Sequence, residues 1–70
     1  MDWNAVLVEI KGERTQRALA AELDYNEAYI ARLLNGDRPI STEVKRRIVQ
    51  RYPEYLSPFL VELLAEKEGV

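Results

Sequence analysis

The stretch Thr15–Gly36, TQRALAAELDYNEAYIARLLNG, predicts two short helices joined by a tight turn. Thr15 is a residue type that caps helix N-termini by accepting a hydrogen bond from a backbone N–H of the first turn, and good helix formers come after it. One face of this first helix is apolar, through Leu19, Ala20 and Leu23 at i, i+1 and i+4. The first half of the stretch therefore indicates an amphipathic helix with a defined start.

The segment Asp24-Tyr25-Asn26 interrupts this period and predicts the turn. Asp tolerates left-handed backbone better than most residues, which a sharp turn can require, and Asn26 can cap the second helix. That helix, residues 27–35, ends at Gly36, which is free to adopt positive φ, and it places inward Ile30, Leu33 and Leu34. Two helices this short cannot bury their apolar faces alone, so the flanking chain has to supply a docking surface.

The spacing of this stretch resembles the helix-turn-helix of the phage-repressor and Cro-like regulators, a family often called Xre-type. The run 26–36, NEAYIARLLNG, is similar to the family's pattern Ser-Gln-x-Tyr-Ile-Ser-Arg-x-x-Asn-Gly. With Gln16 as the first place of the motif, the family's small residue falls on Ala20, and its buried residues fall on Leu19, Ile30 and Leu33. Its turn residue falls on Asp24, where the family usually has Gly, and Asp can adopt the same backbone.

The resemblance implies an all-α fold, a bundle of about five short helices of the lambda repressor-like DNA-binding type. It also implies a function, that of a sequence-specific transcriptional regulator. Such a protein occupies an operator on double-stranded DNA as a homodimer, because two-fold dimers match half-sites about one DNA turn apart. It needs no cofactor.

Composition narrows the function classes. Seventy residues indicate a single domain, 1–70, with the motif at 15–36. The sequence contains neither cysteine nor histidine. Both are common ligands of zinc, and histidine is also the commonest general base. The sequence also has no Gly-rich phosphate loop. We therefore expect no metal site, no small-molecule substrate and no enzymatic activity. With no visible signal peptide or membrane span, a cytoplasmic location is the default expectation.

Charge is unevenly distributed along the chain. The net charge of −2 argues against nucleic-acid binding when the chain is taken as a whole, because phosphates are neutralised by Lys and Arg. Residues 11–52, however, hold nine basic and six acidic side chains, a net of +3, while the two ends hold one basic and six acidic, a net of −5. The basic share falls on the motif and the helix after it, although chance clustering on a mixed surface is an alternative.

The flanking chain predicts three more helices. The first runs from Asp2, its cap, to Lys11, and its apolar face of Trp3, Val6, Leu7 and Ile10 makes Trp3 a core anchor rather than a ligand platform. After a loop at 37–40, Ser41 or Thr42 caps another helix that Pro53 ends; it turns inward Val44, Ile48, Val49 and Tyr52.

A C-terminal helix is predicted at 57–68, with Ser57 as cap and Pro58 in the first helical position. Its segment carries more apolar surface than one closing helix needs. One interpretation is that it caps the core. The other is that part of it is a dimer contact, formed by Tyr55, Phe59 and Leu63.

The resemblance also assigns DNA-contacting residues. Because the second helix of the motif presents its N-terminal part to base edges, the outward places are Asn26, Glu27, Ala28 and Arg32. Arg32 can donate to guanine O6 and N7, and Ala28 can touch a thymine methyl. Glu27 either accepts from cytosine N4 or only favours the positive end of its helix. The alternative for Arg32 is a solvated side chain paired with a carboxylate.

Backbone contacts are expected from residues at the edges of this footprint: Gln16, Arg17, Tyr29, Asn35, Arg38, Lys45 and Arg46. The alternative for Tyr29 is an aromatic side chain packed against the protein. Lys45 and Arg46 belong to a basic stripe, for which the alternative is a solvated face without a ligand. For the whole protein, the rival function is a helix-turn-helix module that binds a regulator or antitoxin-like partner through the acidic, apolar C-terminal segment.

Overall fold

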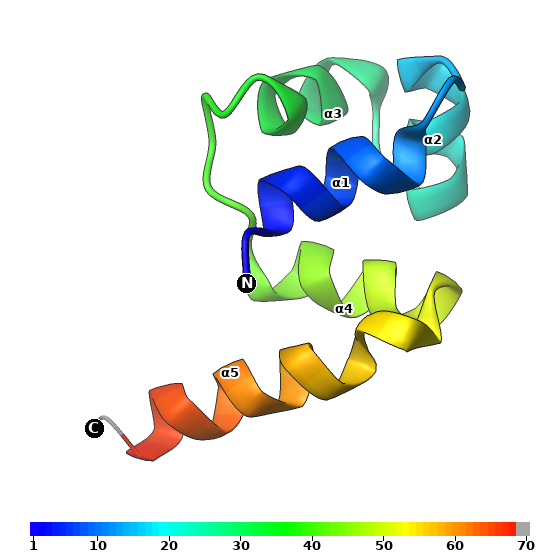
Figure 1. The fold of residues 1–70 in the computed structure, drawn as a ribbon. Helices are drawn as coiled ribbons and strands as arrows, with labels where there is room; N and C mark the ends of the chain where they lie inside the picture. The colour runs from blue at the N-terminus through cyan, green and yellow to red at the C-terminus, as the bar shows by residue number, and fades with distance from the viewer. Residues whose placement is uncertain (69–70) are drawn as a thin grey trace. The chain divides into compact units, whose positions relative to one another are not determined.

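The computed structural model describes residues 1–68, and over this range the chain is all-α, without a strand (Figure 1). The helices are α1 (Trp3–Lys11), α2 (Gln16–Leu23), α3 (Glu27–Leu34), α4 (Thr42–Arg51), a 3-10 turn η1 (Pro53–Tyr55) and α5 (Leu56–Glu68). The predicted all-α class with five helices is confirmed. The chain forms two compact units, one of Asp2–Ser41 with α1 to α3, and one of Met1 with the chain from Thr42 onward.

Side-chain caps begin each helix of the first unit, as the sequence predicted. The Asp2 carboxylate accepts from the N–H groups of Asn4 and Ala5 at 3.1 and 3.2 Å. Thr15 Oγ1 accepts from the Ala18 N–H at 3.1 Å and starts α2. These bonds satisfy N–H groups that have no partner within the helix.

The turn between α2 and α3 has left-handed backbone at Asp24, with φ 61° and ψ 47°. The N–H of Tyr25 donates to the Ala20 carbonyl at 2.9 Å, and the N–H of Asp24 donates to the Ala21 carbonyl at 3.3 Å. This pair of bonds is the Schellman arrangement, which requires a left-handed residue after the helix. Asp24 therefore fills the place in which Gly is usual.

The end of α3 repeats this arrangement with Gly36 at φ 79°. The N–H of Asp37 donates to the Arg32 carbonyl at 3.0 Å, and the N–H of Gly36 donates to the Leu33 carbonyl at 3.2 Å. The predicted role of Gly36 is confirmed. Both helices of the motif therefore end by the same local geometry, which fixes where the loop after α3 departs.

Within the first unit, α3 lies against both α1 and α2 (Figure 1). The predicted inward residues are buried, with exposed fractions of 5% or less: Trp3, Val6, Leu7, Leu19, Ala20, Leu23, Ile30 and Leu33. Ile10 and Leu34 are only half-buried. Arg14 connects α1 and α2, because its guanidinium donates to both oxygens of Glu22 at 3.2 Å and to the Ile10 carbonyl at 2.7 Å.

In the second unit, α4 has Val44, Ile48 and Val49 buried as predicted, and Tyr52 is half-buried. The expected start of the last helix at Ser57 is wrong by one residue: Pro53 opens η1, and α5 begins at Leu56. Pro58 consequently lies inside the first turn of α5. This costs no hydrogen bond, because the first four N–H groups of a helix have no acceptor within it.

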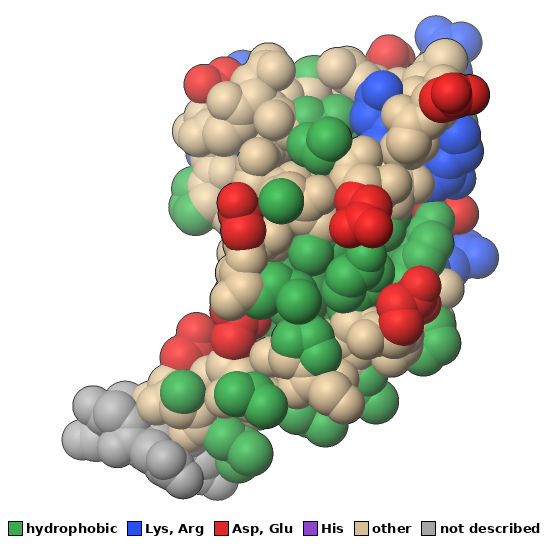
Figure 2. All heavy atoms as spheres, in the orientation of Figure 1, with side chains coloured by type: hydrophobic (Ala, Val, Ile, Leu, Met, Phe, Trp, Pro, Cys, Tyr) green, Lys and Arg blue, Asp and Glu red, His purple; other side chains and the backbone are tan. Residues whose placement is uncertain are grey.

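The apolar residues of α5 occur on more than one face. Phe59 is 6% exposed, and Tyr55 and Leu63 are half-buried. Four other apolar side chains are 46% to 65% exposed, and Figure 2 shows hydrophobic side chains at the surface along α5; the four are Leu56, Leu60, Val61 and Leu64. Among residues 1–68, no helix combines the length and the apolar character needed to cross a bilayer.

Candidate nucleic-acid interface

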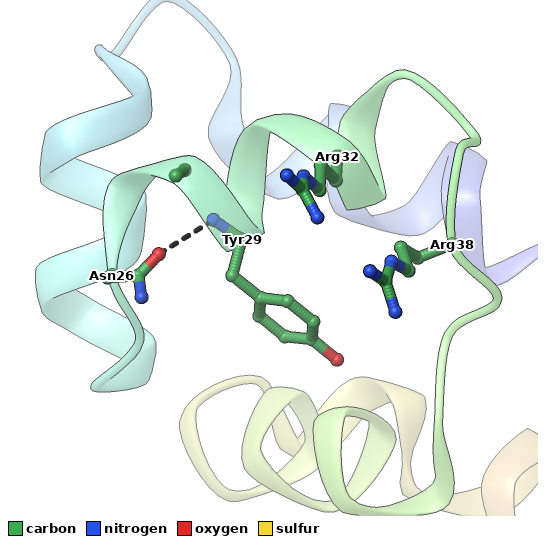
Figure 3. A pocket seen from close by; sticks show the side chains of 5 residues that line it. Asn26, Tyr29, Arg32 and Arg38 are labelled. Carbon is green, nitrogen blue, oxygen red and sulfur yellow. Dashed lines mark hydrogen bonds between the residues drawn. The ribbon is translucent and has the colours of Figure 1, made fainter.

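The start of α3 is fixed by Asn26, whose side-chain Oδ1 accepts from the Tyr29 N–H at 2.7 Å (Figure 3). This confirms the predicted cap. Asn26 remains exposed, as do Glu27 and Ala28 beside it. The side-chain oxygen of Asn26 is occupied by this capping bond, while its side-chain nitrogen still has two N–H groups that can donate to a ligand. The N-terminal end of α3 is therefore both rigidly held and accessible.

A hollow of about 330 Å³ lies on the outer side of α3, and it is lined by Asn26, Ala28, Tyr29, Arg32 and Arg38. Figure 3 shows that Arg32 projects from α3 and Arg38 from the loop after it, and that both guanidinium groups face the same space beside the Tyr29 ring. All five residues are predicted DNA contacts. The structure brings together in one place side chains that the resemblance assigned to base edges and to the backbone.

Arg32 and Arg38 are exposed, and among the side chains described, those of residues 1–66, neither forms an ion pair with Asp or Glu. The alternative in which Arg32 pairs with a neighbouring carboxylate is thus not found in the described part of the chain. Two positive charges that face the same hollow without a counter-charge repel each other, and an anion in the hollow would relieve that repulsion.

Tyr29 is half-buried, and its ring centroid lies 5.2 Å from that of Tyr25 at an interplanar angle of 49°. This tilted contact is typical of packed aromatic pairs. The same ring lines the hollow, so the packed-aromatic alternative and the contact role are compatible in this geometry. The packing holds the ring in place beside Arg32 and Arg38.

Arg17 and Glu27 form an ion pair across the turn, with Nε of Arg17 3.7 Å from Oε2 of Glu27. Their side chains are 85% and 51% exposed, so the pair contributes little to stability. Glu27 also lies in the first turn of α3, where a negative charge is favoured by the helix dipole. Two side chains that the sequence assigned to separate DNA contacts thus offset each other's charge.

The remaining predicted contacts of the first unit lie at helix ends. Gln16 is the first residue of α2 and is half-buried, and Asn35 is exposed directly after α3. The position of Gln16 suits a backbone contact because free N–H groups occur at a helix N-terminus, and Asn35 can donate from its side-chain amide.

The basic residues of α4 belong to the second unit, and most of their charge is matched locally. Lys45 is only 16% exposed, and its ammonium lies 3.9 Å from Glu62 on α5. Arg46 and Arg47 lie 3.7 and 3.3 Å from the carboxylate of Glu43. Lys45 is therefore the least accessible of the predicted backbone contacts, while Arg46, at 60% exposed, remains available to a ligand.

Asn4 contributes a contact that the motif does not predict. Its Nδ2 donates to the Leu33 carbonyl at 2.6 Å and to the Leu34 carbonyl at 3.4 Å, so α1 holds the last turn of α3. The available signal was a polar residue next to Trp3 on the inward side of an amphipathic helix. A part-buried amide at such a place usually satisfies backbone groups.

Comparison of the chain with protein-family models, with curated proteins and with solved structures gave no match. The resemblance to Xre-type regulators therefore rests on the motif residues themselves.

Proposed function

We propose that this protein is a sequence-specific DNA-binding transcriptional regulator of the Cro-like or phage-repressor type, acting by occupancy of an operator. The observation that carries the proposal is the hollow on the outer side of α3, lined by two exposed arginines without a carboxylate partner among the side chains of residues 1–66. It lies on the second helix of a helix-turn-helix, the element that enters the major groove in such proteins.

The proposed roles match the geometry of α3. Asn26, Glu27 and Ala28 lie at its exposed N-terminal end and face base edges, while Arg32 contacts a base edge or a phosphate. Backbone phosphates are contacted from the two sides of the motif by Gln16, Arg17, Tyr29, Asn35 and Arg38, with Arg46 as an additional contact from α4. The local excess of positive charge over residues 11–52 supports this assignment despite the net charge of −2.

A homodimer is part of the proposal, because one such motif reads too few base pairs for useful specificity. The burial of Phe59 leaves Leu56, Leu60, Val61 and Leu64 as the apolar side chains of α5 most available for a contact between copies. We therefore propose that the dimer contact lies on this exposed face and not at the predicted Tyr55, Phe59 and Leu63.

Selection of bound sites from random duplexes, combined with titration at several salt concentrations, tests the proposal. We expect a two-fold symmetric preferred sequence and an affinity that falls steeply with salt, because phosphate contacts release counterions. No binding at low salt, or binding that is insensitive to salt, would reject a DNA-binding role.

The rival function is a protein-interaction module that does not read DNA. The same exposed apolar face of α5 supports it, because such patches mark interfaces, and so does the acidic composition of the chain ends. The two functions differ in their sensitive residues. Substitution of Arg32 and Arg38 impairs a DNA reader and leaves a module that binds through α5 unaffected.

A further inference from the structure

The guanidinium groups of Arg32 and Arg38 meet in one hollow although they come from different segments, the last turn of α3 and the loop four residues beyond its end. Figure 3 shows both directed into the space beside the Tyr29 ring. A guanidinium offers five N–H donors in a planar fork that matches the oxygens of a phosphate, and a Tyr hydroxyl can add another donor. The hollow therefore gathers donors with positive charge and little competing acceptor capacity.

We propose that this hollow binds a single phosphate group of the DNA backbone, shared by Arg32 and Arg38, so that Arg32 orients the protein on DNA and does not read a base. The inference deepens the proposed function and rests on it for the source of the phosphate. Base readout then falls to Asn26, Glu27 and Ala28 at the N-terminal end of α3, of which Asn26 and Ala28 also line the hollow.

Position along α3 is the first argument for a phosphate over a base. Side chains at the N-terminal end of the recognition helix meet base edges, whereas Arg32 lies in the last turn and Arg38 beyond the helix. Two cations from separate segments converge on one point more readily around the tetrahedral oxygens of a phosphate than around the planar edge of one guanine.

The second argument concerns the carbonyl groups at the end of α3, whose partial negative charge opposes an anion. Three of them already accept hydrogen bonds: Arg32 from the Asp37 N–H, Leu33 from the Gly36 N–H and from Asn4 Nδ2, and Leu34 from Asn4 Nδ2. These hydrogen bonds offset part of the negative charge at the end of α3. Ala28 contributes only a methyl group and leaves the hollow open.

The number of phosphates makes the proposal measurable. Each neutralised phosphate contributes about 0.9 to the slope of log K against log salt. If Arg32 and Arg38 share one phosphate on each half-site, the double variant R32A/R38A loses about 0.9 of slope per protomer, or about 1.8 for the bound dimer, and each single variant loses no more than that. Two separate phosphates per protomer would give a loss of about 3.6 for the dimer of the double variant.

The experiment combines that titration with a neutral methylphosphonate placed at successive backbone positions of the selected duplex. At one position on each half-site, we expect the wild-type protein to fall to the affinity of R32A/R38A, with no further loss in that variant. Affinity should fall on every duplex sequence equally. The control is R51A, which removes one exposed positive charge from α4 and should leave the slope unchanged.

A second arm uses inorganic phosphate without DNA, against chloride at equal ionic strength, with the Nε–H signals of Arg32 and Arg38 observed by NMR. Saturable shifts of the Arg32 Nε–H signal that weaken in R38A, and of the Arg38 Nε–H signal that weaken in R32A, support the shared phosphate site. A slope loss of about 3.6 for the dimer, a loss confined to one base position, or the absence of saturable shifts would overturn the shared site. Absence of DNA binding at any salt with intact phosphate shifts would instead reject the DNA-binding role and the DNA backbone as the source.

Discussion

Asn4 Nδ2 lies 2.6 Å from the carbonyl oxygen of Leu33, so a side chain from α1 closes the end of the helix that carries the candidate interface. The two residues are 29 positions apart in the sequence. Because α3 has only eight residues, few bonds of its own hold its orientation, and this contact helps to fix the last turn of α3, which carries Arg32.

Replacing Asn4 by Ala should lower the free energy of unfolding by about 1 kcal/mol, since a part-buried amide donor is lost. Asn4→Asp should cost more, because it removes the donor and sets a carboxylate against a carbonyl oxygen. Urea unfolding monitored by circular dichroism measures both. Gln50→Ala, an exposed amide on α4, is the control and should stay within about 0.5 kcal/mol of wild type. Equal effects of Asn4→Ala and Gln50→Ala would show that the contact contributes nothing.

The turn residue Asp24 gives a second prediction. Its left-handed backbone is unfavourable for a β-branched side chain, so Asp24→Val should destabilise the protein by about 1–2 kcal/mol. Asp24→Gly should remain close to wild type, because Gly adopts this conformation without a steric cost. Thermal unfolding of the two variants side by side checks the difference. A Val variant as stable as the Gly variant would mean that the turn relaxes to another conformation.

The contact between Arg14 and Glu22 gives a third prediction. Arg14→Lys keeps the charge but loses the two-pronged contact with Glu22 and the bond to the Ile10 carbonyl, and we expect a loss of about 1 kcal/mol. A double-mutant cycle with Glu22→Gln, measured in urea, isolates the pair. Additive single effects would indicate that the bond to the Ile10 carbonyl, rather than the pair, carries the loss.

Glu27 distinguishes two interpretations of the start of α3. If Glu27 mainly offsets the charge of Arg17, Glu27→Gln should raise affinity for every duplex about two- to fivefold at low salt and steepen the salt dependence. If Glu27 accepts from cytosine, affinity should fall on the selected site only. Titration of the selected duplex and of a scrambled one separates the cases, with Glu54→Gln, exposed in the second unit, as the matched control.

The two faces of α5 give the last prediction. Phe59→Ala should lower the free energy of unfolding by about 3–5 kcal/mol, because removal of the buried ring leaves a cavity. A loss of this size is a large part of the total stability of a domain this small. Leu60→Glu, at a position 48% exposed, should leave the helical content unchanged and convert a dimer into a monomer in sedimentation. A folded Leu60→Glu variant with the wild-type mass would reject the proposed contact between copies.

Much of the candidate interface could be anticipated from the motif. The five residues that line the hollow are all predicted DNA contacts, since a motif with fixed spacing carries their positions on α3 and the loop. The motif does not specify whether neighbouring carboxylates offset the charges of the predicted contact residues. Arg17 forms an ion pair with Glu27 and Lys45 with Glu62, whereas Arg32 and Arg38 have no carboxylate partner in the part of the chain whose side chains are described, residues 1–66.

The sequence by itself determined the helix bounds to within a residue or two, the caps at Asp2, Thr15 and Asn26, and the left-handed positions at Asp24 and Gly36. These features depend on interactions within about one turn of chain, so neighbouring residues suffice to specify them. Only the tertiary structure decided that Asn4 closes α3 and that Phe59 is buried while Leu60 is exposed. A helix such as α5, with apolar residues on several faces, can bury any of them, and the choice is made by what packs against it.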